Sequence, residues 1–396
     1  MELLSLVWTN LMRNKVRTVL TTLSVFVALF LFCLLHGVTD TLTESTKVGS
    51  ERRLVTRNKL SLVFPLPMSH LEKIRAVSGV SAVTWSNWFG GEDPVNPREF
   101  YAKFAVDSKT YFPLYASDME IVAASPAPEG APVPAGVPAQ LAAYMNERTA
   151  CVVGEGLLKK MGWKLGQTIH VNGTIYPGSW AYTIRGVYHP KVKALDAETM
   201  FFHWDYLYEN TNHNAMVGIY QFTLSDPTQA AAVGKRIDDL FENSAYATHT
   251  ETERAFQAGF VSMFGNIPFV IMVIGLAVAF SIFLVAAVTM MMAIRERTPE
   301  FAVLKTLGFA DGSLFFMVLA EAAAITLTGG IAGSLLAKFL LERSGLGLPG
   351  FSVMFVHWET VGLGIGVAAL MGAFSGLLPA WQASRLKIVD ALRKVG

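Results

Sequence analysis

The chain has 396 residues, of which 52% are hydrophobic and 16% charged, and its formal net charge is +1. Its mean hydropathy is +0.40. This composition excludes an ordinary soluble protein, and the small net charge argues against a nucleic-acid partner. Of the two cysteines, Cys33 lies in an apolar run and Cys151 in a polar region, so we expect no internal disulfide.

Four charge-poor segments are each close to or longer than the ~20 residues that span the hydrocarbon core of a bilayer. They are Thr18 to Val38, Ile267 to Ile294, Ser313 to Ala337 and Thr360 to Ala383. The first is longer than the roughly 7 to 15 residues of a signal-peptide core, so we interpret it as an uncleaved anchor. The predicted fold is therefore a membrane protein with four transmembrane α-helices and a large α+β extracytoplasmic domain between helices 1 and 2.

The segments between these spans complete the predicted division of the chain. It comprises an interfacial helix (1–17), a first span (18–39), an extracytoplasmic domain (40–250), a stalk with the second span (251–294), a cytoplasmic coupling helix (295–311), a third span (312–338), an outer loop (339–358), a fourth span (359–384) and a cytoplasmic tail (385–396).

Basic residues favour one side of the predicted membrane. Those on that side are Arg13, Lys15 and Arg17 before the first span, Arg295, Arg297 and Lys305 between the second and third, and Arg385, Lys387, Arg393 and Lys394 after the fourth. The positive-inside rule then places both termini in the cytoplasm.

The large outer segment alternates between strand and helix patterns. Predicted strands are Leu60 to Phe64, Val80 to Trp85, Phe100 to Val106, Ala150 to Val153, Thr168 to Val171, Tyr182 to Tyr188 and Val217 to Leu224; predicted helices are Pro67 to Ala76, Glu155 to Met161 and Thr228 to Phe241. A proline-rich stretch at 126–138 marks a subdomain junction or an exposed loop, so two subdomains are expected. A continuous helix from Glu251 to Arg295 would be roughly 65 Å long. We expect it to be a stalk, bent at Pro268, that ties the domain to the second span.

The short segment from Arg295 to Gly308 has the pattern of a small helix between two spans. Thr298 suits an N-cap, Pro299 the first helical position, Glu300 the N-terminal dipole and Gly308 the stop. Its apolar residues are more numerous than an unpartnered surface loop should carry: Phe301, Val303, Leu304 and Leu307. The segment is either an amphipathic turn resting on the bilayer or a docking site for a cytoplasmic protein.

Within the spans, Glu321 is the only ionisable residue far from a predicted end, roughly 13 Å beyond Asp311 at the helical rise. A lone acid favours a structural hydrogen bond over a proton relay. Three pairs of glycines spaced four residues apart predict close helix packing: Gly329 with Gly333, Gly362 with Gly366, and Gly372 with Gly376.

Patterns for catalysis and metal binding are missing from the sequence. We find no Walker A loop, His-Glu-x-x-His, Cys-x-x-Cys or nucleophile elbow. The eight histidines include His70 and His203 but show no paired ligand spacing, so we predict no metal site and no catalytic residue.

Several motifs, in order along the whole chain, resemble the ABC transporter permeases of the MacB/FtsX type. The segment Arg295 to Gly308 is similar to the signature that follows the family's second span, and Glu321 with Gly329-Gly330 resembles its Glu followed by a Gly-Gly pair. Pro379-Ala380 to Ala383, Ala391-Leu392-Arg393 and Val152 to Ile169 resemble further family elements. Pro299 and Phe301-Ala302 depart from the signature.

The resemblance implies a MacB-like periplasmic core domain and a non-catalytic subunit of the inner membrane. It implies a pair of permeases, either a homodimer or two related chains, with two cytoplasmic ABC ATPase subunits and a periplasmic adaptor. This chain would bind no cofactor, and ATP and Mg would bind the partner ATPase. Residues implied in ATPase coupling are Arg295, Glu296, Glu300, Leu304, Lys305 and Gly308. Residues implied in transmembrane structure are Glu321, Gly329, Gly330, Gly333 and Pro379.

The expected function is mechanotransmission, in which ATP hydrolysis changes the conformation of the periplasmic domain and drives export with the adaptor. LolCE-like lipoprotein extraction and activation of a cell-wall hydrolase fit the same resemblance. A membrane receptor or regulatory module, and a secondary transporter that uses Glu321, are alternatives from other classes.

Overall fold

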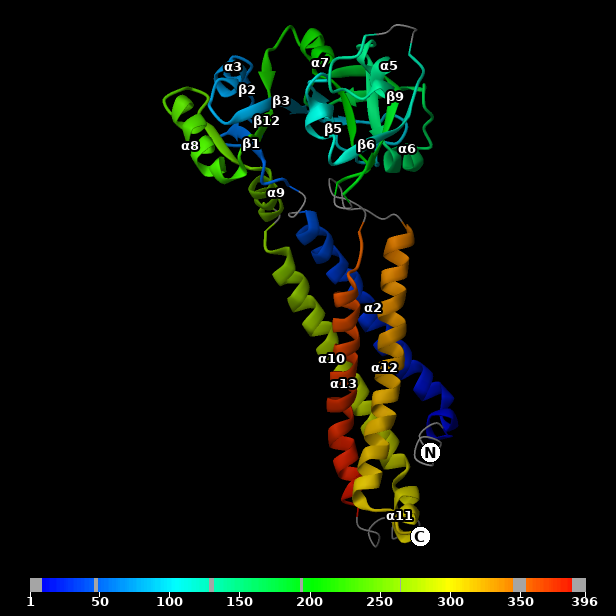
Figure 1. Cartoon of the computed structure of the whole chain (residues 1–396). Helices are drawn as coiled ribbons and strands as arrows, with labels where there is room; N and C mark the ends of the chain where they lie inside the picture. Colours follow the sequence, from blue (N-terminus) through cyan, green and yellow to red (C-terminus); the bar gives the residue numbers. More distant parts are fainter. Residues whose placement is uncertain are drawn as a thin grey trace. The chain divides into compact units, whose positions relative to one another are not determined.

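The computed structural model describes residues 9–45, 49–127, 132–192, 195–263, 265–344 and 354–386 (Figure 1). The chain forms two compact units. One, which we call the helical unit, contains Met1–Thr41, Asn266–Leu346 and Met354–Gly396. The other, the sheet unit, contains Leu42–Gly265 and Gly347–Val353.

Long apolar helices form the helical unit. Its elements are α2 (Lys15–Ser45), α10 (Ile267–Glu296), α11 (Thr298–Thr306), α12 (Asp311–Ser344) and α13 (Trp358–Ser384). All but α11 are long and apolar enough to cross a membrane. The predicted four spans are therefore confirmed. Residues 9–13 are helical, whereas the rest of the expected interfacial helix and the tail from 387 lie outside the described residues.

Glycines allow α12 to approach its neighbours closely. A Cβ at Gly329 would lie 2.6 Å from the Thr22 carbonyl oxygen of α2, and one at Gly330 would lie 2.4 Å from Cβ of Ala368 in α13. A Cβ at Gly372 of α13 would lie 2.3 Å from Oγ1 of Thr326. Two of the three predicted glycine pairs thus pack inside the unit. At Gly362 and Gly366 no described atom lies within 4 Å of such a Cβ.

The expected stalk is two helices rather than one. Thr248–Thr252 is strand β13, and α9 (Glu253–Ser262) ends before α10 begins at Ile267. Gly265 lies between them with φ of +80°, a conformation that stops a helix. The Asn266 side chain then accepts a hydrogen bond from the Phe269 amide (3.2 Å), and Pro268 lies in the first turn of α10. Pro268 therefore starts a helix instead of bending one.

A single large sheet runs through the sheet unit. Its strands, in spatial order, are β13 (Thr248–Thr252), β1 (Arg53–Asn58), β12 (Ile219–Leu224), β3 (Val80–Trp88), β5 (Lys103–Val106), β10 (Met200–His203), β7 (Ala150–Gly154), β9 (Gly178–Pro190), β8 (Thr168–Gly173) and β4 (Gly91–Glu92), with β6 (Met119–Ala124) also paired to β9. The pairs β10–β5 and β7–β9 are parallel. A separate small sheet pairs β2 (Leu66–Pro67) with β11 (Met216–Val217). The two expected subdomains thus share one sheet.

Short helices cover this sheet. They are α3 (His70–Arg75), α4 (Tyr111–Leu114), η1 (Ala139–Leu141), α5 (Ala142–Met145), α6 (Glu155–Met161), α7 (Trp204–Asn210), η2 (Pro227–Gln229) and α8 (Ala230–Phe241). The proline-rich stretch links β6 to η1, both of which pack on β9. Val137 of the stretch and Leu141 of η1 are buried.

One predicted strand is wrong, and several strands were not predicted, among them β1, β6, β10 and β13. Residues 60–64 form turns in which Leu60 and Val63 are exposed. The strand is β1 instead, and its Arg53 is buried because Nε donates to Glu253 (2.7 Å) and the guanidinium also pairs with Asp118. Charged residues usually predict exposure, so a strand with a buried arginine lacks the apolar pattern by which strands are recognised in a sequence.

Candidate functional site: the α11 junction

The short helix between the second and third spans begins one residue earlier than predicted. Arg297 occupies the N-cap position of α11, and the Thr298 hydroxyl donates back to the Ile294 carbonyl (3.2 Å). Pro299 lies in the first turn, where its missing N–H has no cost. Gly308 follows the helix with φ of +96°, which a side chain would oppose.

The inner face of α11 is part of the core of the helical unit. Phe301 and Ala302 are buried, and Leu304 packs against the same hydrophobic cluster. That cluster joins the start of α2, α10, α12 and α13 through Leu11, Met290, Ile294, Leu314, Met317, Val318, Ala322, Ile325, Ala380 and Ala383. The outer face carries Val303 and Leu307, which are 50% and 72% exposed. The four apolar residues noted in the sequence thus divide between an anchoring face and a free face.

Glu321 of α12 has a charged partner that the sequence did not reveal. Nη1 of Arg297 lies 2.9 Å from Oε2 of Glu321, and both side chains are about nine-tenths buried (12% and 10% exposed). Arg297 also pairs with Glu300 (3.3 Å), and its guanidinium lies 5.2 Å from the centre of the Phe301 ring. The pair fixes the first turn of α11 against α12.

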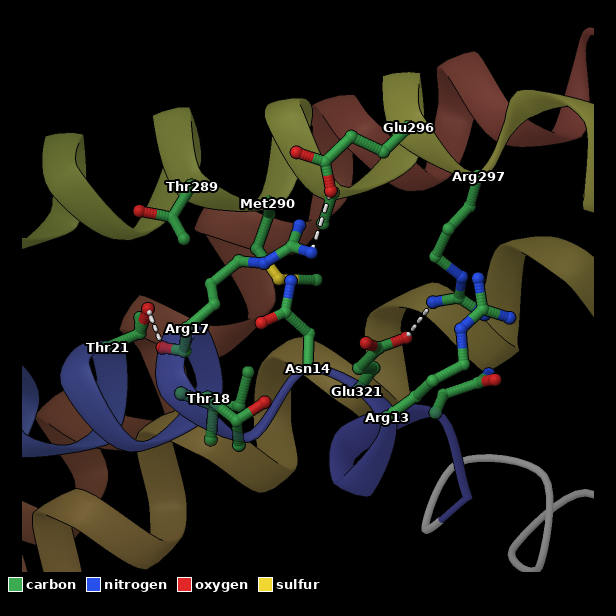
Figure 2. Close-up of a pocket in the computed structure, with 13 residues that line it drawn as sticks. Arg13, Asn14, Arg17, Thr18, Thr21, Thr289, Met290, Glu296, Arg297 and Glu321 are labelled. Carbon is green, nitrogen blue, oxygen red and sulfur yellow. Dashed lines mark hydrogen bonds and ion pairs between the residues drawn. The ribbon is translucent and has the colours of Figure 1, made fainter.

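Two further ion pairs join the start of α2 to this junction. Arg17 reaches Glu296 at 2.8 Å (Figure 2). Arg13 pairs with Glu300. Burial alone would raise the pKa of Glu300, but the hydrogen bonds and charges of Arg13 and Arg297 outweigh it, so this pKa is lowered and the carboxylate stays ionised. The sequence offered a signal here, since Arg13 and Arg17 are four residues apart and face one side of a helix.

Lys305 is directed inward instead of toward a docking partner. Its Nζ donates to the carbonyl oxygens of Ser384 (2.6 Å) and Leu386 (3.0 Å) and pairs with Asp311 (2.7 Å). Its side chain is 11% exposed. These carbonyls end α13, so Lys305 acts as a cap for another helix. Of the coupling residues inferred from the sequence, Arg295 and Glu296 are exposed, Glu300 is half-buried, and Leu304 and Lys305 hold α11 in place.

The residues expected to shape the membrane helices lie at helix contacts. Gly329 and Gly333 face α2, Gly330 faces α13, and Pro379 is buried within α13. Together with Glu321 they surround the packed interior of the helical unit, away from its exposed surface.

The sheet unit contains a buried Ser-His-Tyr cluster whose geometry is structural. His203 Nε2 lies 2.7 Å from the Tyr144 carbonyl oxygen, which can only accept, so Nδ1 accepts from the Ser108 hydroxyl at 2.5 Å. Burial lowers the pKa of His203 to about 4. The cluster is enclosed in the core, with Ser108 and His203 each under a tenth exposed. Among the described residues there is no group of three or more His, Cys, Asp or Glu side chains placed to hold a metal ion.

Comparison with known proteins assigns both units. The MacB-like periplasmic core domain family matches residues 18–240, and the FtsX-like permease C-terminal family matches residues 269–388. A macrolide export ATP-binding/permease protein MacB from Chlorobaculum tepidum is 34% identical over 26% of this chain and 16% of its own length. The uncharacterized ABC transporter permease YknZ of Bacillus subtilis is 30% identical over 26% of each chain.

A third relative matches over nearly its whole length. The uncharacterized ABC transporter permease MJ1507 of Methanocaldococcus jannaschii is 23% identical over 99% of this chain and 98% of its own. The MacB and YknZ matches, by contrast, span far less than two thirds of those proteins. With family matches over both units and four apolar helices, this multi-pass membrane protein belongs to the ABC transporter permeases of the MacB/FtsX type.

Proposed function

We propose that this chain is the permease subunit that couples ATP hydrolysis by a separate cytoplasmic ATPase to conformational change of its sheet unit. One observation carries the proposal: α11 is anchored firmly on one face while its other face exposes Val303 and Leu307. Such a helix can transmit force from a partner because its own contacts are already made. ATP and Mg would bind the partner, and this chain would bind no cofactor.

The names of the relatives support a partner ATPase. MacB is called an ATP-binding/permease protein, whereas MJ1507, which matches over nearly the whole chain, is called a permease alone. No Walker A pattern occurs in the printed sequence. We therefore assign nucleotide hydrolysis to a second gene product, present in two copies on a pair of permeases.

The contacts of α11 support a route for the motion. Arg297 and Lys305 tie α11 to α12 and α13. Arg13, just before α2, pairs with Glu300 of α11, and Arg17 of α2 pairs with Glu296 at the end of α10. The chain of α2 continues into the sheet unit, and the chain of α10 comes from it. Displacement of α11 by a closing ATPase would therefore move α2 and α10, the two helices connected to the sheet unit, and select between two conformations of that unit.

Orientation and cargo complete the proposal. The basic residues at the α11 end favour a cytoplasmic location for that end and for both termini, and the sheet unit would then lie outside the inner membrane. The names of two relatives, MacB and the PvdT protein of Pseudomonas entomophila, describe macrolide export and pyoverdine export. We assign export, with a periplasmic adaptor on the sheet unit, as the transport reaction.

Affinity co-purification of the tagged full chain in mild detergent tests ATPase docking. Val303→Asp and Leu307→Asp each place a charge on the exposed face of α11 and leave the core unchanged. The matched control is Gln382→Asp, which adds the same charge at an exposed position near the end of α13, at the α11 end of the helical unit. An ATPase that accompanies the native chain and the control, and is lost from both α11 variants, supports the proposal. An ATPase retained by the α11 variants, or absent with the native chain under every nucleotide condition, overturns it.

A further inference from the structure

A cavity of about 170 Å³ lies in the helical unit between the start of α2, the end of α10 and α12 (Figure 2). Arg13, Arg17 and Arg297 line it together with Glu296 and Glu321. Uncharged polar groups from Asn14, Thr18 and Thr289 complete the polar wall. Charged side chains from three separate helices thus meet around a space large enough to hold a small polar group.

The arginines around this cavity have hydrogen-bonding capacity left over. Each guanidinium carries five N–H donors. The ion pairs described above use Nη2 of Arg13, Nη2 of Arg17, and Nε and Nη1 of Arg297. Nη1 of Arg17 is buried and has no hydrogen-bond partner among the described residues. A buried donor left without a partner costs roughly 1 to 3 kcal/mol, so an acceptor is expected to occupy the space next to it.

The unused N–H donors of the lining favour a group with several acceptor oxygens. Three arginines and two glutamates line the cavity, and each of these glutamates holds one guanidinium. Glu300 lies outside the lining and pairs with Arg13 and Arg297, so these ion pairs already balance the charges. A phosphodiester carries one negative charge and several acceptor oxygens that suit the planar fork of arginine. It would supply Nη1 of Arg17 with the missing acceptor.

The position of the cavity favours a lipid as the source of that phosphate. Arg17 lies near the start of α2, and Glu296 is the last residue of α10, so the cavity is at the end of apolar helices. Met290 and Ile325 form its apolar wall, and Val288 and Met292 of α10 are 45% and 58% exposed nearby along the same helix. Acyl chains could lie on that exposed face while the headgroup enters between the helices.

We propose that this cavity binds the phosphate of an anionic phospholipid between α2, α10 and α12. The site is independent of ATPase docking on α11, because it needs only the membrane location of the chain. The lipid would contact Arg17, which also holds Glu296, so its presence would adjust how α2 is tied to the α11 junction.

Native mass spectrometry of the purified full chain tests the site, with phosphatidylglycerol, phosphatidylcholine and inorganic phosphate as probes. We expect phosphatidylglycerol to be retained about tenfold better than phosphatidylcholine, and Arg17→Gln to reduce its retention about tenfold. Arg295→Gln is the matched control, because Arg295 is an exposed cation two positions from Arg297 that does not line the cavity. Equal losses in the two variants would mean general attraction to basic surface and would overturn the proposal.

A second variant tests the cavity without changing charge. Thr289 lines the space, and its hydroxyl donates to the Val285 carbonyl of its own helix (2.7 Å), so Thr289→Leu fills the cavity at little cost to folding. Loss of bound phosphatidylglycerol from this variant supports the site, and undiminished binding overturns it. Displacement of phosphatidylglycerol by millimolar inorganic phosphate would show that a free anion, not a lipid, is the ligand.

Discussion

Arg297 and Glu321 lie 24 positions apart in the chain, yet their side chains form a buried ion pair of 2.9 Å between the first turn of α11 and the middle of α12. The pair exists because the chain reverses at the end of α10 and returns along α12. Glu321 is therefore neutralised by a fixed guanidinium. This geometry favours a structural role for the acid, since a proton relay needs a carboxyl group that can change its charge freely.

Loss of Glu321 should weaken the α11 junction strongly. In Glu321→Gln the buried Arg297 charge loses its 2.9 Å partner and retains Glu300 at 3.3 Å, so the cost should be at the low end of that for breaking a buried pair, about 3 kcal/mol. Glu296→Gln, in which the lost carboxylate is 62% exposed, should cost less than about 1 kcal/mol. Thermal unfolding of the full chain in nanodiscs compares the two.

A double variant separates the pair itself from the buried charge. Arg297→Met with Glu321→Leu removes both charges, and apolar replacement of a buried pair is often neutral. We expect it to recover much of the stability lost in Glu321→Gln. If the double variant is less stable than Glu321→Gln, the ion pair must stabilise the fold by more than it costs to bury its two charges.

Glycine positions in the spans give a second prediction. A Cβ at Gly333 would lie 2.4 Å from the Phe26 carbonyl oxygen, a backbone atom that cannot move alone. Gly333→Ala should therefore cost roughly 2 kcal/mol through overpacking. Gly366→Ala is the control, since no described atom lies within 4 Å of its Cβ position and alanine favours a helix. Equal melting temperatures in nanodiscs would contradict the packing of α12 on α2.

The sequence predicted those parts of the fold whose signal is local. Long apolar runs can only be spans, and the turn from β7 into α6 was correctly placed because a buried strand precedes a glycine and a helical pattern. Strand β1 was missed because its two arginines look exposed. Their partners are Glu253 and Glu251, which lie 200 and 194 positions away. Only the folded sheet brings these charges together.

The α11 junction shows the same limit. Its length, proline and terminal glycine are local features and were predicted, but the direction of each side chain was not. Leu304 and Lys305 look like docking residues in the sequence and hold the helix in the structure, because their partners belong to α12 and α13. Of the four apolar residues of this segment noted in the sequence, Val303 and Leu307 remain exposed and available to a partner.

Lys305 gives a third prediction because it caps the end of α13. In Lys305→Met the carbonyls of Ser384 and Leu386 lose a charged donor, and a charge-assisted hydrogen bond contributes about 1.5 kcal/mol or more. Hydrogen exchange in the last turn of α13 should then accelerate by about tenfold, measured by mass spectrometry of the full chain. Lys305→Arg should retain most of the protection. Unchanged exchange in the methionine variant would show that water can replace Lys305 as the hydrogen-bond donor to these carbonyls.

His203 predicts an acid sensitivity of the sheet unit. Burial lowers the pKa of His203 to about 4, whereas the unfolded chain protonates this histidine near its ordinary pKa of about 6.5. Between these values the unfolded state binds more protons, so the free energy of unfolding falls as the pH falls, by about 3 kcal/mol across the window. His203→Gln can still donate to the Tyr144 carbonyl but cannot be protonated, so its stability should depend less on pH.

Urea unfolding of the full chain, followed by tryptophan fluorescence from pH 7.5 to 4, measures the difference between the two proteins. Other groups such as His70, whose pKa burial also lowers to about 4, titrate in both proteins and cancel in that difference. Parallel pH dependences would mean that the folded chain holds His203 protonated, in conflict with the hydrogen bond that Nδ1 accepts from Ser108.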